Sequence, residues 1–149
     1  MTASLQNGHR AARAIAGKCL AMRSRRLGRL ITRMYEEALR PTGMTTAQLN
    51  ILVAVTIQEP TRSSDVARLL GLEKSTLSRN LARMVEAGWV RTTEDTDGRA
   101  LLLETTPAGL RLLEKAYPAW QRAQEATRKK LGPTAFDALE SMTEAIRED

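Results

Sequence analysis

The residues best suited to chemistry lie between Lys74 and Arg83, where hydroxyl, amide and cationic groups alternate with leucines. Leu77, Leu81, Met84 and Val85 recur three and four residues apart, which predicts a helix with one apolar stripe. The other face would present Lys74, Ser75, Thr76, Ser78, Arg79, Asn80 and Arg83. Short hydroxyl side chains allow a helix to approach the major groove of duplex DNA, where arginine pairs with guanine and asparagine with adenine. An ordinary solvated helix face has a similar composition, so this segment alone leaves both interpretations open.

The residues that precede this helix favour the DNA interpretation. A short helix is expected from about Ser64 to Leu70, and Gly71 after it suits the left-handed turn that ends many helices. Ser63 and Ser64, at the start of the short helix, are candidates for phosphate contact. Gly88 is expected to cap the longer helix. A short helix, a tight turn and a longer polar-faced helix together predict a helix-turn-helix, whose second helix reads the major groove.

A β-hairpin is expected immediately after the second helix. Two extended runs, at about 89–93 and 100–105, flank an Asp-Gly pair, which is a hairpin signal. Arg99 at this tip is expected to reach a minor groove, with Asp97 orienting its guanidinium. The alternative is a plain turn with one exposed arginine, and acidic residues in the same loop would repel phosphate. The predicted fold class is therefore mainly α: a winged helix-turn-helix with a two-stranded β wing.

Helices are expected to flank this winged module on both sides. After a disordered tail at residues 1–10, one domain is predicted over 11–149, with the winged helix-turn-helix at 45–106. The hydrophobic spacing, together with the breaks at prolines and glycines, predicts further helices over about 11–39, 47–58, 107–131 and 134–147.

The net charge of +6 suggests a polyanionic partner, although this charge is unevenly distributed. Residues 1–34 carry eight Arg and Lys and no acidic residue, whereas the rest of the chain has a net charge of −2. No apolar run approaches the roughly 20 residues of a transmembrane helix. No secretory signal peptide is evident either, so a cytoplasmic protein without membrane contact is expected.

Catalysis and metal binding find little support in the sequence. Cys19 is the only cysteine and His9 the only histidine, so neither an internal disulfide nor a Cys/His metal cluster can form. The motifs of serine hydrolases, phosphate-binding loops and zinc proteases are not found. We therefore expect no enzymatic activity and no cofactor.

Taken together, these segments resemble the MarR (multiple antibiotic resistance regulator) family. The resemblance covers residues 20–142 and is carried by 69–81, by Glu86-Ala87-Gly88-Trp89-Val90-Arg91, by Asp97-Gly98-Arg99 and by Thr105-Thr106-Pro107-Ala108-Gly109. It implies a bacterial transcription regulator, usually a repressor. It also implies a homodimer in which helices at 11–40 and 107–149 intertwine, and two modules that read a pseudo-palindromic duplex with half-sites about one helical turn apart.

The resemblance further implies an effector that releases the DNA. A pocket between the dimerisation helices and the winged module is expected to take a small anionic or phenolic ligand. Its candidate residues are Met22, Arg26, Leu30, Met34, Met44, Leu52 and Trp120. Ordinary core packing is the alternative for the apolar members, and Arg26 equally suits a solvent-facing position.

Cys19 suggests a second kind of effector, an oxidant. Its position resembles that of the sensing cysteine in the organic-hydroperoxide branch of the family, and Lys18 and Arg23 would favour its thiolate form. A buried structural cysteine is the alternative. Two further functions stay open: a winged-helix module for protein association without DNA, and a thiol peroxidase built on Cys19, for which the sequence offers no neighbouring histidine as base.

Overall fold

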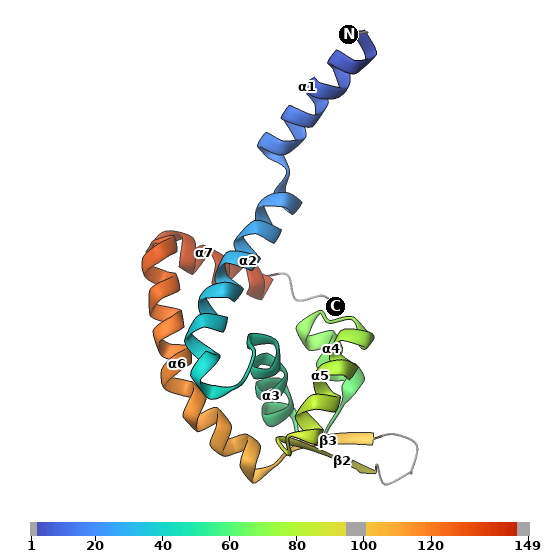
Figure 1. Cartoon of the computed structure of the whole chain (residues 1–149), viewed down its shortest axis with the longest axis vertical. Coiled ribbons are helices and arrows are strands. Elements are labelled where there is room, and N and C mark those ends of the chain that lie inside the picture. Colours follow the sequence, from blue (N-terminus) through green and yellow to red (C-terminus); the bar gives the residue numbers. More distant parts are fainter. Residues whose placement is uncertain (1–2, 95–100, 146–149) are drawn as a thin grey trace. The chain divides into compact units, whose positions relative to one another are not determined.

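The computed structural model describes residues 3–94 and 101–145, which form helices and one small sheet (Figure 1). Two compact units are distinguished, Met1–Arg33 and Met34–Asp149. The first, which we call the N-terminal unit, comprises α1 and most of α2. The elements are α1 (Ala3–Lys18), α2 (Leu20–Leu39), the 3-10 turn η1 (Arg40–Thr42), α3 (Thr46–Gln58), β1 (Thr61–Arg62), α4 (Ser63–Leu70), α5 (Lys74–Glu86), β2 (Val90–Glu94), β3 (Leu101–Thr105), α6 (Pro107–Leu131) and α7 (Pro133–Ala145).

The N-terminal unit differs from the sequence expectation. Its helix begins at Ala3, where a disordered tail over residues 1–10 was expected, because this stretch is rich in helix-forming residues and free of proline. The predicted single helix over 11–39 is interrupted at Cys19. The break is only one residue long, since the Cys19 N–H donates to the Ile15 carbonyl at 2.8 Å and the Arg23 N–H to the Cys19 carbonyl at 3.2 Å.

Side-chain caps define where the flanking helices begin. Thr45 and Gln48 form a capping box at α3, in which each side chain accepts from the other's backbone N–H. Thr106 caps α6 by accepting from the Gly109 N–H at 3.1 Å, and Pro107 fills the first helical position. Thr45 and Thr106 therefore fix the first residues of α3 and α6.

The sheet has three strands rather than the predicted two. Strand β3 lies between β1 and β2, and both pairings are antiparallel. In the added pairing Thr61 faces Leu103, and in the hairpin Val90 faces Thr105. Strand β1 was not predicted because its two residues are too few to show an alternating pattern.

The core of the second unit is built around α3. Figure 1 shows this helix between α6 and the α4–α5 pair. Its apolar residues are buried on several sides, which explains why its sequence is more continuously hydrophobic than that of a surface helix. The fully buried large side chains are Leu39, Ile51, Leu52, Val55, Val66, Met84 and Val90.

Within the described residues, no helix combines the length and the apolar character needed to cross a lipid bilayer.

Candidate DNA-binding surface

Helix α5, which we call the recognition helix, buries the predicted apolar stripe. Leu77 is 2% exposed, Leu81 9% and Met84 0%, whereas Val85, which was also expected in the stripe, is 40% exposed. Because α5 turns this stripe into the core, its opposite side faces solvent. The exposed polar residues there are Ser75, Ser78, Arg79 and Arg83, together with Lys74 at the N-terminus.

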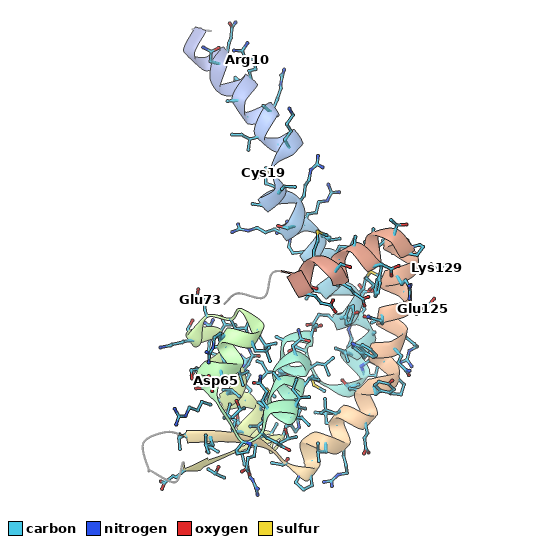
Figure 2. All side chains as sticks on the ribbon, turned by 180° about the vertical axis from the view of Figure 1, so that it is seen from behind. Arg10, Cys19, Asp65, Glu73, Glu125 and Lys129 are labelled. Carbon is cyan, nitrogen blue, oxygen red and sulfur yellow. The ribbon has the colours of Figure 1, made fainter. Side chains whose placement is uncertain are left out.

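Gly71 allows α4 and α5 to meet at a tight turn. Its φ of 60° lies in the left-handed region, and its N–H donates to the Arg68 carbonyl at 3.3 Å. A residue with a Cβ is strained in this conformation. The chain then enters α5 at Glu73, which lies at the start of the helix in Figure 2. The Glu73 side chain makes no capping hydrogen bond.

Thr76 and Asn80 lie on the flank of α5 rather than at its most exposed edge. Both are partly buried, and the Asn80 side-chain amide donates to the Thr76 carbonyl at 2.9 Å. This bond takes up one of the two hydrogens of the Asn80 amide and holds the amide against its own helix. The structure therefore separates these two residues from the exposed group formed by Ser75, Ser78, Arg79 and Arg83.

A groove of about 590 Å³ runs between α4, α5 and the hairpin. Four of the sequence-predicted residues line it together: Ser63, Ser64, Lys74 and Ser78. Its lining also includes Val85, which was expected in the buried stripe, and Leu101, which the sequence alone did not single out. The only sequence signal for Leu101 is its place in an extended run, which does not tell which way the side chain points.

Some of the arginines that the structure describes in the second unit form ion pairs and others do not. Arg68 pairs with Asp65 one turn away on α4, and Arg91 pairs with Glu104 across the hairpin at 2.5 Å. Among the described residues, Arg79 has no ion-pair partner. Its charge is therefore available to an external anion. Asp97 and Arg99, the predicted wing residues, lie outside the described residues.

A second, apolar cavity of about 580 Å³ opens between α3, α4 and α6. The rings of Tyr117 and Trp120 stack beside it, with centroids 5.6 Å apart and planes inclined by 19°. None of its lining residues is charged: they are Leu49, Asn50, Val53, Ala54, Thr56, Ile57, Leu69, Leu70, Leu113, Tyr117 and Trp120.

Of the seven predicted ligand residues, only Trp120 lines this cavity. Met44 and Leu52 belong to the core, as the packing alternative expected. Met34 is partly buried, with its sulfur 3.9 Å from the Thr127 hydroxyl. In the N-terminal unit Met22 is exposed, and Arg26 and Leu30 line a shallow depression on α2.

Cys19 is partly exposed at the break between α1 and α2 (Figure 2). Tyr35, in the second unit, donates its hydroxyl hydrogen bond to Gln124 on α6. Within the described residues, no group of three or more His, Cys, Asp or Glu is placed to hold a metal ion.

Similar sequences are found among known transcriptional regulators. A model of the MarR family matches residues 42–100. The HTH-type transcriptional regulator YwoH of Bacillus subtilis is 30% identical over 78 residues, which are 52% of this chain and 57% of YwoH. The multiple antibiotic resistance protein MarR of Escherichia coli is 29% identical over 99 residues, 61% of this chain and 69% of that protein.

Among solved structures, the M. tuberculosis transcriptional regulator MosR in complex with DNA is 31% identical. The alignment covers 86% of this chain and 96% of MosR, with a TM-score of 0.74. The motifs, the helix-turn-helix with its hairpin, and this likeness over nearly the whole of MosR agree: the chain belongs to the MarR family.

Proposed function

We propose that this protein is a sequence-specific, double-stranded DNA-binding transcription regulator that acts as a repressor. One observation carries the proposal: the recognition helix buries its leucine stripe and leaves Ser75, Ser78, Arg79 and Arg83 exposed. A helix of this kind fits a major groove, with its backbone held close by the short serine side chains. The DNA complex of MosR, a protein 31% identical to this chain, supports the same assignment.

Each exposed group has a distinct role in this proposal. Arg79 is best placed to read a base, because it is exposed, has no ion-pair partner among the described residues and has the planar fork that matches guanine. Ser63, Ser64 and Lys74 line the groove beside the helix and suit the phosphate backbone. Arg83, one turn beyond Arg79, also suits phosphate.

The test begins with the operator, selected from genomic fragments by the purified protein. Arg79→Ala is then expected to weaken operator binding by about 5- to 150-fold, the equivalent of roughly 1–3 kcal/mol for one bidentate base contact. Binding to an unrelated duplex should change much less. Arg111→Ala, an exposed arginine on α6, is the control. Equal losses on both duplexes would contradict base reading by Arg79.

We further propose that the protein acts as a homodimer on a pseudo-palindromic operator. Large apolar side chains are exposed on the N-terminal helices, including Leu20 at 79%. Exposed apolar surface of this kind marks a site of association. Two copies related by a two-fold axis would present two recognition helices to successive major grooves.

A small-molecule effector is favoured by the apolar cavity beside Tyr117 and Trp120. Its lining has no cation, so we propose that the ligand is neutral and aromatic rather than anionic. Phenol is expected to raise the melting temperature and weaken operator binding, whereas benzoate, a charged molecule of similar size, should do neither. Ile57→Gln, which places an amide at the cavity wall, should abolish the phenol effect.

The alternatives predict different results. A winged-helix module for protein association would fold but show no preference for any duplex. Sensing through Cys19 would make operator release by peroxide depend on Cys19, so Cys19→Ser would remain bound. A peroxidase would consume peroxide catalytically in the presence of a thiol reductant, which Cys19→Ser would abolish.

A further inference from the structure

The N-terminal unit carries an unusual charge for a segment of its length. Residues 1–34 contain seven arginines, one lysine and no acidic residue. All eight basic side chains are exposed: Arg10, Arg13, Lys18, Arg23, Arg25, Arg26, Arg29 and Arg33. Within the described part of the chain, none of them forms an ion pair. Their like charges repel one another, so the unit is suited to an external polyanion.

Three of these arginines share one side of α2. Arg26, Arg29 and Arg33 are spaced three and four residues apart, which places them one above the other on a helix. Together with Arg23, Leu27 and Leu30 they line a depression of about 480 Å³. We call Arg26, Arg29 and Arg33 the arginine row.

The apolar residues of α2 lie on a different side. Leu27, Ile31 and Met34 follow the same three-and-four spacing and are partly buried, whereas the arginine row is exposed. Leu27 lies at the boundary, because it also lines the depression, whereas Ile31 and Met34 lie outside it. An association of two copies through the apolar face would leave the arginine row free to bind something else.

The composition of the unit points to the phosphates of duplex nucleic acid. Arginine predominates over lysine, and its planar fork matches phosphate oxygens in a bidentate manner. Residues 1–34 contain no Phe, Trp or Tyr. The unit therefore lacks the aromatic rings on which single-stranded bases stack most strongly, and it lacks the aromatic anchors typical of helices that lie in membrane surfaces.

We propose that the N-terminal unit is a second, sequence-independent DNA-binding surface, in which the arginine row contacts duplex phosphates. This proposal rests on the proposed function, because the duplex is the one that the recognition helix selects. The recognition helix would supply specificity, and the arginine row would add affinity for any duplex. Such a division agrees with the charge distribution, since the helix-turn-helix and wing at residues 61–103 carry seven basic and six acidic side chains.

The salt dependence of DNA binding tests this proposal. The triple variant Arg26→Gln/Arg29→Gln/Arg33→Gln is compared with Arg111→Gln/Lys115→Gln/Arg122→Gln, which removes three exposed charges from α6. Affinity is measured for the operator and for an unrelated duplex between 50 and 200 mM KCl, roughly the range over which phosphate contacts dominate. The slope of log K against log salt should become shallower by about 0.9 for each phosphate that the α2 variant no longer neutralises, which is up to about 2.7 per chain. The α6 variant should keep the wild-type slope.

The preference for the operator over an unrelated duplex distinguishes a failure of this proposal from a failure of the proposed function. The α2 variant should bind both duplexes more weakly by the same factor, so its preference for the operator should persist. If Arg79→Ala leaves operator preference unchanged while the α2 variant still lowers the slope, the proposed function fails and the phosphate contact stands. Equal slopes for the α2 and α6 variants, or no change in slope, would overturn the phosphate contact.

Two further measurements identify other partners. Loss of the dimer in the α2 variant, seen by light scattering, would assign the row to an acidic surface of a second copy and overturn the proposal. If the variant instead loses binding to vesicles of equal phosphatidylglycerol and phosphatidylcholine but keeps the wild-type slope for DNA, the row binds a membrane surface and the proposal is overturned.

Two control variants complete the test. Arg26→Lys/Arg29→Lys/Arg33→Lys, which retains the charge, should recover most of the wild-type slope. Arg10→Gln/Arg13→Gln/Lys18→Gln should also lower the slope and serves as a second variant if the first does not fold.

Discussion

Arg79 and Asn80 are neighbours in the sequence, yet the recognition helix directs them differently. Arg79 is exposed and has no ion-pair partner among the described residues, whereas Asn80 bonds to the Thr76 carbonyl of its own helix. The sequence predicts both as base-reading residues because both side chains suit base edges. Which of two adjacent positions lies at the outer edge depends on how α5 rotates against its core, and the polar residues themselves do not encode that rotation.

At the residue scale, close packing leaves no room for a side chain at Gly109. A Cβ at this position would lie 2.2 Å from the Trp89 carbonyl oxygen and 2.9 Å from Thr105 Cγ2. Gly109→Ala is therefore expected to lower the free energy of unfolding by roughly 1–3 kcal/mol, as overpacking does. Urea denaturation followed by circular dichroism measures this. Gly28→Ala, where nothing lies within 4 Å, should instead stabilise its helix by about 0.5–1 kcal/mol.

Tyr35 makes stability depend on alkaline pH. Burial raises the pKa of Tyr35 above its usual 10.0, and a hydrogen bond with Thr127 partly opposes the rise. Because the folded state holds this proton more tightly than the unfolded state, the stabilisation is complete below pH 10 and is lost as the pH rises through the folded pKa. Above pH 10 the unfolding free energy of the wild type should therefore fall relative to that of Tyr35→Phe. A difference that stays constant from pH 8 to pH 11 would contradict this.

At the scale of the element, the start of the recognition helix is left uncapped. Glu73 makes no side-chain bond to the first turn, unlike Thr45 at α3. Glu73→Asp keeps the charge and shortens the side chain to one that caps well, so it should raise the free energy of unfolding by about 1 kcal/mol. Thr45→Ala should lower the same quantity by a similar amount. Chemical denaturation of both variants checks the pair, and no gain in Glu73→Asp would mean that α5 begins in another geometry.

Most elements could be predicted from local signals in the sequence. The leucine spacing, Gly71, Thr106 and Pro107 each act through neighbouring residues, and the structure has its helix boundaries near them. Strand β1 could not be predicted, because two residues become a strand only by pairing with β3. A pocket between the dimerisation helices and the winged module was expected, but of the residues that line the apolar cavity only Trp120 was named for it. The reason is related: the walls come from α3, α4 and α6, so no one segment carries the pattern of the cavity.

At the scale of the whole molecule, exposed apolar residues argue for a homodimer. The expected mass in light scattering is twice the 16.5 kDa of the chain. Leu20→Asp puts a charge at a side chain that is 79% exposed in the single chain, so it should leave each copy folded and reduce the measured mass to that of one chain. Leu101→Asp, at a residue 61% exposed on β3, is the control and should keep the dimer mass. A dimer that survives Leu20→Asp would place the association surface elsewhere.

The junction at Trp89 and Thr106 has a mechanical consequence. The Trp89 N–H donates to Met84 at the end of α5 at 2.9 Å, the Thr106 N–H donates to the Trp89 carbonyl at 3.0 Å, and Gly109 allows the first turn of α6 to press against the same carbonyl. The end of the recognition helix and the start of α6 are thus joined through the same residue, Trp89, so we expect a displacement of one helix to affect the other. Tyr117 lies about 16 Å along α6 from Thr106, at 1.5 Å per residue. If a ligand binds in the apolar cavity as proposed and displaces α6 near Tyr117, we expect this displacement to tilt the recognition helix.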